Sequence, residues 1–366
     1  MEHISPERGE VHVARVSDAG LVRRLTWMRG TATSRSERHA LIIAPREARN
    51  ATVLSVAAVV PPERLTNTEL AAKLGLSEDW ILSRTGIRER PIARPDERLT
   101  DYATRAGAKA LVQAAVDPAD LDLVLVGTMT QDELTPNAAP LVAHALGARR
   151  AGAVDLGAAC MAFLAGVALG ASHIETGRVR YVLVIGADFI SRVTDYEDKR
   201  TAPLFADAAG AVVLGPADGS NGLIGPIVLG SDGSGAATIQ VSHCDRKVRM
   251  DGPEVYRHAV ARMTQVTFQA IEQAGLMLED IDLFVYHQAN GRILRALAER
   301  LSLPPVRLVD CIETFGNSSA ATLPVGLADA ARDGRLKPGA LVLVAAFGAG
   351  FTWGGGVIEW GAQADA

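Results

Sequence analysis

The chain has 366 residues, of which 48% are hydrophobic and 22% are charged, and its formal net charge is -5 at pH 7. A chain of this length and composition can bury a large core, as two domains or as two closely packed halves. The negative charge argues against a dedicated nucleic-acid binder. No apolar run reaches the ~18 residues of a membrane span, so we expect no membrane partner.

The number and spacing of the cysteines also limit the kinds of site and the compartment that we expect. The three cysteines include no Cys-x-x-Cys pair and follow no regular spacing. They therefore provide neither a disulfide framework nor a zinc site, which fits a reducing compartment. We expect a cytoplasmic protein with no metal site and no bound cofactor.

Residues 1–50 differ from the rest of the chain in composition and in hydrophobic pattern. They contain arginine but no lysine, and they have no sustained hydrophobic period. The lack of an apolar h-region excludes a secretory signal, and interspersed acidic residues fit poorly with a transit peptide. We expect a poorly ordered N-terminal extension. A regulatory or partner-binding arm is the alternative.

From Ala51 onward, strands and helices alternate. The patterns predict strands over 52–60, 123–126, 154–156, 182–185 and 211–214, and helices over 69–74, 77–85, 100–115, 141–146 and 161–175. Thr66 and Ser77 are candidate N-cap residues for the first two helices. This alternation predicts an α/β fold in which helices cover a largely buried sheet.

The second half repeats the pattern of the first. The segment 121–126 is echoed by 281–285, and the segment 181–187 by 340–346. The helix after Cys160 then corresponds to the helix after Asn317. A duplication of this kind predicts that the two helix starts meet near a pseudo-dyad, which brings Cys160 beside Asn317.

Three polar islands interrupt otherwise buried-looking sequence. Cys160 follows an apolar strand and opens an apolar helix, His287–Asn290 follow another strand, and Asn317 lies in Gly316–Ala321. A cysteine attacks a thioester only as thiolate, and a position at the positive end of a helix favours that form. A nearby His287 can hold the proton. Cys244 and Cys311 lack such neighbours, and we interpret them as structural.

Five motifs in order resemble those of β-ketoacyl-acyl-carrier-protein synthase III, a thiolase-fold condensing enzyme. They are Thr85–Arg90, the Cys160 context, His287–Asn290, Gly316–Ala321 and Phe347–Gly354. The resemblance covers Ala51 to Trp360. It implies a thiolase-like, duplicated five-layer α-β-α-β-α architecture and a homodimer. Residues 51–220 would form the half that carries the cysteine, and residues 221–366 the half that carries the histidine and asparagine.

The resemblance also implies a reaction. It is the decarboxylative Claisen condensation of an acyl-CoA starter with malonyl-acyl carrier protein, through an acyl-Cys160 intermediate, to give a 3-oxoacyl-acyl carrier protein. Such a step initiates fatty acid or polyketide synthesis. His287 and Asn317 would donate hydrogen bonds to the enolate, and the backbone amides of Cys160 and Ala349 would form the oxyanion hole. The family usually has Gly where this chain has Ala349.

Substrate contacts are carried over from the same resemblance. Trp80 and Arg84 match residues that grip the adenine and phosphates of coenzyme A. Lys199 and Arg200 stand where the family has Arg-Gly, so charge is kept while the stacking surface changes. The remaining expected contacts are Asn290 for the substrate and Arg292 for docking the acidic acyl carrier protein.

The size of the Thr135 side chain bears on the length of the acyl group that the pocket can hold. It precedes Pro136 at the place where many acetyl-primed family members have Phe before Pro. In the family this loop reaches across the dimer and forms the floor of the partner's acyl pocket. Because Thr is smaller, we expect a deeper pocket.

Two other functions compete with condensation. One is an acyltransferase of specialised metabolism that moves an acyl group to a hydroxyl or amine without decarboxylation, and the other is a non-catalytic scaffold. Retention of both His287 and Asn317 favours condensation over the first, and the presence of all three catalytic residues disfavours the second. Thiolase itself would need a second reactive Cys between Phe347 and Gly356, where none occurs.

Overall fold

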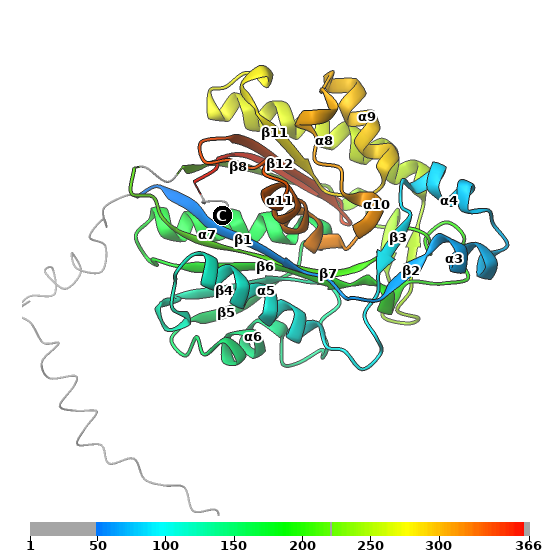
Figure 1. Cartoon of the computed structure of the whole chain (residues 1–366), viewed down its shortest axis with the longest axis horizontal. Coiled ribbons are helices and arrows are strands. Elements are labelled where there is room, and N and C mark those ends of the chain that lie inside the picture. The colour runs from blue at the N-terminus through cyan, green and yellow to red at the C-terminus, as the bar shows by residue number, and fades with distance from the viewer. Residues whose placement is uncertain (1–48, 220–221, 362–366) are drawn as a thin grey trace, which may run out of the picture. The chain divides into compact units, whose positions relative to one another are not determined.

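Two β-sheets form the framework of the computed structural model, which describes residues 49–219 and 222–361 (Figure 1). The first sheet has five strands, in the spatial order β1 (Ala51–Val59), β7 (Asp207–Pro216), β6 (Val182–Phe189), β4 (Leu123–Gly127) and β5 (Gly152–Leu156). The second has four, in the order β8 (Leu223–Ser231), β13 (Thr352–Glu359), β12 (Leu341–Gly348) and β11 (Leu283–Tyr286).

The two sheets have the same topology. In the first, β4 pairs in parallel with β6, which pairs antiparallel with β7, and in the second β11, β12 and β13 repeat these pairings. The place that β5 takes beside β4 is taken beside β11 by Leu308, which forms a parallel bridge with Phe284. The predicted duplication is therefore present strand by strand.

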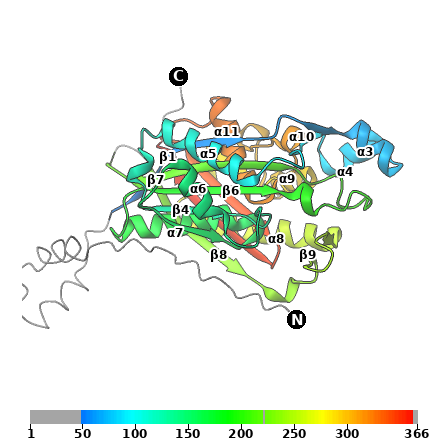
Figure 2. The same ribbon diagram turned by 90° about the horizontal axis from the view of Figure 1, so that it is seen from below.

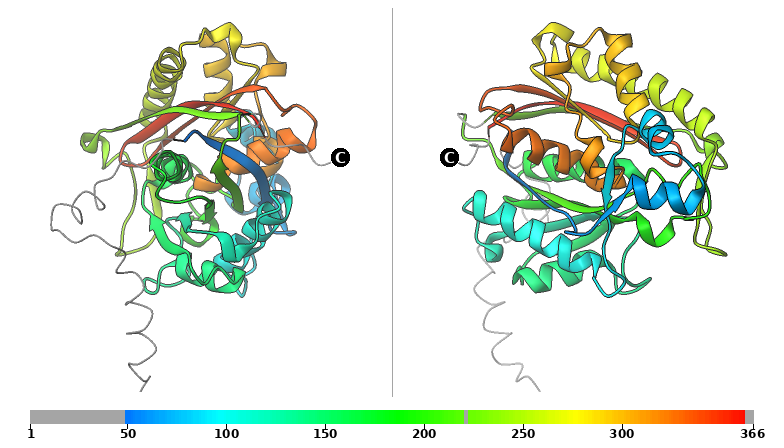
Figure 3. Two further views of the ribbon diagram at one scale, coloured as in Figure 1. Left: turned by 90° about the vertical axis from the view of Figure 1, so that its left-hand side faces the viewer. Right: turned by 45° about the vertical axis from the view of Figure 1, so that its right-hand side comes forward.

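Helices form three layers around these sheets, as Figures 1 and 3 show. Helices α7 (Ala162–Glu175) and α11 (Thr322–Arg332) lie between the sheets, α5 (Leu99–Gln113) and α6 (Ala138–Leu146) cover the outer face of the first sheet, and α8 (Gly252–Ala274) and α9 (Gly291–Leu301) cover that of the second. Separate clusters of buried apolar side chains fill the spaces between layers. The predicted five-layer thiolase-like architecture is confirmed.

The central position of α7 explains its composition. A helix that contacts sheets on both sides must be apolar around most of its circumference. Close packing also requires small residues on it. A Cβ atom added at Gly166 would lie 2.7 Å from Val184 Cγ1, and one added at Gly170 would lie 2.9 Å from Leu214 Cδ1.

The predicted helix signals are found near the N-terminal end of the described chain. Thr66 and Glu69 form a capping box at α3 (Asn67–Leu74). Ser77 accepts a hydrogen bond from the Trp80 amide at α4 (Glu78–Thr85), which ends at the left-handed Gly86. Gly86 allows α4 to approach α9, because a Cβ there would lie 3.1 Å from Gly291 Cα (Figure 2).

Several short elements escaped prediction because three or four residues are too few to show a hydrophobic period. They are β2 (Arg64–Thr66), β3 (Glu89–Pro91), β9 (Ile239–Val241), β10 (Val248–Met250) and α10 (Ile312–Phe315). Of the predicted N-terminal extension, only Arg49 and Asn50 are described, and they hydrogen-bond to Glu175 and Ala217. The rest of that prediction lies outside the described residues.

The described parts of both halves belong to one compact unit. The predicted boundary between the halves, near residue 220, stays a prediction. Within the described ranges, no helix combines the length and apolarity needed to cross a bilayer.

The pseudo-symmetry converges on two matching 3₁₀ turns, η2 (Ala159–Met161) before α7 and η7 (Ser319–Ala321) before α11. Each turn begins with a non-glycine residue in the left-handed region, Ala159 at φ 46° and Ser319 at φ 53°. The turns contact each other, and each also contacts the central strand of the opposite half. We call η2 and η7 the two elbows.

Glycine makes these strand contacts possible. A Cβ added at Gly348 of β12 would lie 2.9 Å from the Cys160 amide nitrogen, and one at Gly186 of β6 would lie 2.8 Å from the Ala320 carbonyl carbon. Both neighbours are backbone atoms that side-chain rotation cannot move. The two elbows can therefore approach the sheets this closely only because β6 and β12 carry glycine at these positions.

We predict that Gly186→Ala destabilises the protein by about 1–3 kcal/mol, the usual cost of forcing extra atoms into a packed core. The measurement is the free energy of unfolding from denaturant titration. Gly157→Ala is the matched control, since no atom of the described residues would crowd a Cβ there within 4 Å. Equal stability of the two variants would contradict the close packing of the elbow.

Candidate active site

A cavity of about 520 Å³ brings Cys160, His287 and Asn317 together, although they come from different halves of the chain. It is also lined by most of the other residues predicted for the site: Trp80, Arg84, Lys199, Arg200, Asn290, Arg292 and Ala349. Thr135 is the exception. It lies exposed in the loop between β4 and α6 and is not part of the lining in this chain.

Cys160 lies in the middle of the first elbow, with its sulfur facing hydrogen-bond donors. The Ser319 hydroxyl donates to the Cys160 sulfur at 3.5 Å. The backbone amides of Cys160 and Ala349 also interact with the sulfur and favour its charged form. The two amides predicted as an oxyanion hole are thus both directed at the region of the reacting sulfur.

Burial nevertheless dominates the titration of Cys160. Loss of water around the thiol raises its pKa to about 11, more than the donors lower it, and the buried carboxylate of Asp188 adds to the rise. The prediction that the position of Cys160 at a helix start favours the thiolate is therefore wrong for the net shift. Desolvation of a charged sulfur outweighs the hydrogen bonds that the Ser319 hydroxyl and the two backbone amides give it. The resting residue is a neutral thiol.

His287 follows β11 and is fixed by the strand pairing, because its backbone amide donates to the Ala345 carbonyl of β12 at 2.9 Å. The side chain is buried, and desolvation lowers its pKa to about 3. The imidazole is therefore neutral at physiological pH. Its Nδ1 atom lies 2.6 Å from the hydroxyl of Thr322, at the start of α11.

Asn317 is held by four hydrogen bonds at the entrance to the second elbow. Its backbone pairs with Leu204 and Ala206. Its side-chain oxygen accepts from the Ser319 amide at 2.9 Å, and its side-chain nitrogen donates to the Ala289 carbonyl at 3.3 Å. The carboxamide has two N–H groups, so the second can serve a ligand in the cavity.

The mouth of the cavity is cationic and partly aromatic. The Arg84 guanidinium lies 5.8 Å from the Trp80 ring centre, and Arg292 lies 5.5 Å from that of Tyr256. Arg200 forms a 3.0 Å ion pair with Asp198, which lowers its net attraction for an anion. An anionic, planar ligand head would find both charge and stacking surface here.

Asn290 has a structural duty that its sequence position alone did not reveal. Its side-chain oxygen caps α9 by accepting from the Arg292 amide at 2.8 Å. Its side-chain nitrogen donates to the Arg84 carbonyl at 3.2 Å. It therefore ties α4 to α9 and fixes the backbone beneath two of the mouth cations.

Asp188, which the sequence analysis missed, organises the floor of the site. Its buried carboxylate accepts hydrogen bonds from the Met129 amide at 2.8 Å, the Thr130 hydroxyl at 2.9 Å and the Ala320 amide at 3.2 Å. It thus joins the loop after β4 to the second elbow. An acidic residue within the fully buried strand β6 was the signal that pointed to it.

The other two cysteines differ from each other. Cys311 is buried, and burial raises its pKa, so it fits the structural interpretation. Cys244 is exposed in a turn, and that interpretation is wrong for it. Among the described residues, no group of three or more His, Cys, Asp or Glu side chains is placed to hold a metal ion.

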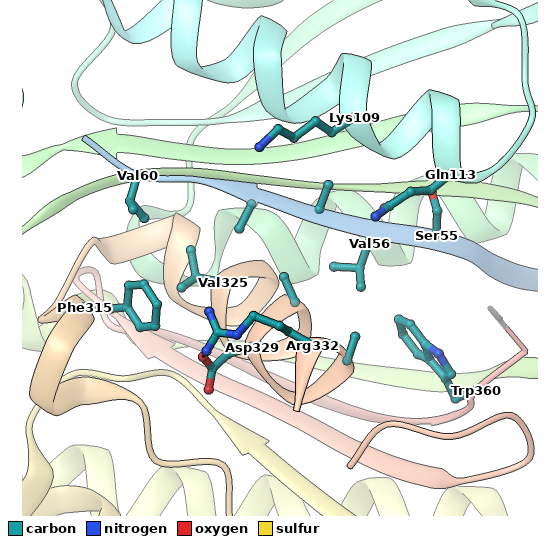
Figure 4. Close-up of a pocket in the computed structure, with 14 residues that line it drawn as sticks. Ser55, Val56, Val60, Lys109, Gln113, Phe315, Val325, Asp329, Arg332 and Trp360 are labelled. Carbon is teal, nitrogen blue, oxygen red and sulfur yellow. The ribbon is translucent and has the colours of Figure 1, made fainter. Parts of the chain in front are cut away.

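A second cavity, of about 460 Å³, lies along the edge strand β1 between α5 and α11 (Figure 4). Lys109 and Gln113 line it from α5, while Asp329 and Arg332 line it from α11 and pair with each other. It contains none of the predicted site residues. We therefore assign the chemistry to the Cys160 cavity.

Comparison with known proteins agrees with this geometry. Residues 154–233 match the family model described as 3-oxoacyl-[acyl-carrier-protein (ACP)] synthase III, and residues 271–360 match the model of its C-terminal part. The chain is 42% identical over 312 residues to a beta-ketoacyl-[acyl-carrier-protein] synthase III of Listeria innocua, covering 85% of this chain and 99% of the relative. The relative of the same name from Symbiobacterium thermophilum is 42% identical over 316 residues, with 82% and 96% covered.

Solved structures give the same result. The 3-oxoacyl-[acyl-carrier-protein] synthase III of Aquifex aeolicus superposes with a TM-score of 0.82 at 36% identity, covering 85% of this chain and all of that one. The priming β-ketosynthase of the R1128 polyketide pathway superposes with a TM-score of 0.83 at 38% identity, covering 87% of this chain and 98% of that one. The chain belongs to the β-ketoacyl-acyl-carrier-protein synthase III family.

The raised pKa of Cys160 predicts how the free protein reacts with iodoacetamide. Because only the thiolate reacts, alkylation of Cys160 should be slow at pH 7 and rise about tenfold per pH unit through pH 9, below a pKa of about 11. Peptide mass spectrometry separates this site from the exposed Cys244. A rate that levels off below pH 8 would show that the free enzyme holds a thiolate.

Proposed function

We propose that this protein condenses an acyl-CoA starter with malonyl-acyl carrier protein, through an acyl group carried on Cys160. The observation that carries the proposal is the shared cavity. A cysteine sulfur facing two backbone amides lies there with a neutral imidazole and a carboxamide that has a spare N–H. The family membership of the chain supports the same reaction.

The first half-reaction acylates Cys160. The ring nitrogen of His287 that faces away from Thr322, Nε2, takes the proton of the thiol as the sulfur attacks the thioester carbonyl. The amides of Cys160 and Ala349 stabilise the oxyanion that forms. When the tetrahedral intermediate collapses, the C–S bond to coenzyme A breaks, and the departing thiolate recovers the proton from Nε2. His287 ends the step neutral.

The second half-reaction makes the new C–C bond. The malonyl carboxylate leaves as CO₂, and the electron pair of that bond forms an enolate, whose oxygen accepts hydrogen bonds from His287 and Asn317. The enolate carbon attacks the acyl carbonyl on Cys160, and the Cys160 thiolate leaves and is reprotonated from solvent. A neutral imidazole suits this step because it stabilises the enolate without protonating its carbon.

The mouth of the cavity supports coenzyme A as the donor and an acidic carrier as the acceptor. Arg84 and Lys199, beside Trp80, offer charge and stacking to an adenine nucleotide. Arg292 lies at the same mouth, where an acidic carrier protein would deliver its thioester. The competing acyl transfer without decarboxylation forms no enolate, so it would not use the spare N–H of Asn317.

We also propose a cytoplasmic homodimer. Strand β5 forms one edge of the first sheet, and the apolar side chain of its central residue, Val154, is 49% exposed. Nearby in the chain, Leu134 is 71% exposed next to Thr135. An unpaired apolar edge strand invites pairing with a second copy, and such pairing would bring Thr135 toward the partner's cavity.

The two half-reactions should respond differently to loss of the enolate donors. His287→Ala and Asn317→Ala each remove one donor, and each donor at comparable oxyanion sites is worth roughly 10²–10³ in rate. The Asn317 variant should lose malonyl decarboxylation while self-acylation from acyl-CoA stays within about tenfold of wild type. Rapid-quench assays of each half-reaction measure both. Loss of acylation with decarboxylation intact in Asn317→Ala would reverse the assignment.

Thr135 predicts the preferred starter. If it closes the partner's acyl tunnel, the enzyme should prefer chains longer than acetyl, because each buried CH₂ adds up to about 0.8 kcal/mol. Thr135→Phe should refill the space and move the preference toward acetyl-CoA. The measurement is the ratio of kcat/KM for acetyl-CoA and a medium-chain acyl-CoA. An unchanged ratio in the variant would show that another group closes the tunnel.

A further inference from the structure

Thr322 connects the catalytic histidine to the backbone of the second elbow. Its hydroxyl lies 2.6 Å from His287 Nδ1 and also 3.0 Å from the Ser319 carbonyl, to which it donates. Thr322 and His287 are each only 2% exposed. In the resting enzyme, the hydrogen bonds of this pair are therefore made between protein groups.

The single proton of the Thr322 hydroxyl determines which tautomer of the His287 imidazole fits the observed hydrogen bonds. A hydroxyl has a single proton to donate. Because the Thr322 proton points to the Ser319 carbonyl, its oxygen can only accept from His287. A neutral imidazole that donates from Nδ1 carries no proton on Nε2, which then presents a lone pair. The hydrogen-bond pattern therefore distinguishes the two tautomers of His287.

We propose that Thr322 is a positioning residue that sets the tautomer of His287, keeping the ring proton on Nδ1 in the resting enzyme so that Nε2 is free to take the proton of Cys160. This inference rests on the proposed function, since it assigns His287 to the acylation step. The Ser319 carbonyl that selects this state belongs to the same elbow as the hydroxyl that faces the Cys160 sulfur.

The same geometry offers a second state for the second half-reaction. If the Thr322 hydroxyl rotates, it donates to Nδ1 and gives up the Ser319 carbonyl. The ring proton then sits on Nε2, which can donate to the enolate oxygen. Exchange requires water to give a proton to Nε2 and to take one from Nδ1, and departure of coenzyme A between the two steps admits water to the cavity. This second state does not need the Thr322 oxygen as an acceptor, so loss of the hydroxyl should affect the acylation step and not the enolate step.

The test compares Thr322→Val with Thr322→Ser. Valine has nearly the same shape but no hydroxyl, so the Nδ1 proton loses its acceptor and Nε2 becomes the better site. We expect acylation of Cys160 by acyl-CoA to slow by roughly 10–10²-fold, part of the usual contribution of a general base. Malonyl decarboxylation should change by less than about threefold. Serine should restore acylation.

A spectroscopic measurement separates tautomer control from simple packing. In ¹⁵N-histidine-labelled enzyme at pH 7.5, the His287 resonances, assigned with His287→Ala, should show a protonated Nδ1 in wild type and in Thr322→Ser. In Thr322→Val they should show a protonated Nε2. Thr264→Val is the matched control, because among the described residues that buried hydroxyl bonds only to the Val260 carbonyl of its own helix. It should change neither the spectrum nor the rates.

The spectra and rates distinguish failure of the tautomer proposal from failure of the proposed function. A wild-type spectrum with the proton on Nε2, or equal loss of both half-reactions in Thr322→Val, would overturn the tautomer proposal. If Thr322→Val proves poorly folded by melting temperature, the wild-type and Thr322→Ser spectra still decide. Failure of wild-type enzyme to form an acyl adduct from any acyl-CoA would instead contradict the proposed function, and the two failures can be told apart.

Discussion

Close backbone contact at the pseudo-dyad is the constraint on which the site depends. The chain does not bring Cys160 near Asn317 through any local motif, since the two residues lie 157 positions apart in the sequence. They meet because each elbow packs against the central strand of the opposite half, at Gly348 and Gly186. A Cβ atom at either glycine would collide with the backbone of an elbow.

The electrostatics of the site follow from that packing. Excluding water raises the pKa of Cys160 to about 11 and lowers that of His287 to about 3, so the pair rests as thiol and neutral imidazole. The charged nucleophile must therefore be made during the reaction, when the substrate carbonyl is in place to receive it. This arrangement protects the sulfur from adventitious electrophiles and keeps the histidine in the neutral form that the enolate step needs.

A single network of hydrogen bonds connects the two elbows and the catalytic histidine. Asn317 holds the amide of Ser319, the hydroxyl of Ser319 reaches the Cys160 sulfur, and Thr322 links the Ser319 carbonyl to His287. Asp188 anchors the same elbow from the first sheet through the Ala320 amide. The side chains of Ser319, Thr322 and Asp188 thus link the second elbow to Cys160, to His287 and to the first sheet.

Much of this could be predicted from the sequence, for identifiable physical reasons. Long apolar strands and the repeated strand pattern indicated the duplicated α/β fold, and Cys160, His287 and Asn317 stood out as polar residues in apolar surroundings. The role of Thr322 could not be predicted, because a threonine that opens a helix is ordinary until its partners are known. Asp188 stands out as an acid within an apolar strand, but the partners of its carboxylate depend on the fold. The pKa of Cys160 was misjudged because a helix start is visible in sequence, whereas the loss of water around the thiol depends on the packed cavity.

Mass spectrometry of a single turnover tests the central claim most directly. The intact protein is incubated with a panel of acyl-CoAs, digested to locate the adduct, and then treated with malonyl-acyl carrier protein. The account predicts one acyl group on Cys160, which malonyl-acyl carrier protein removes with formation of a 3-oxoacyl carrier protein, and no adduct in Cys160→Ala. An acyl group on another residue, or an adduct on Cys160 that malonyl-acyl carrier protein leaves untouched, would contradict it.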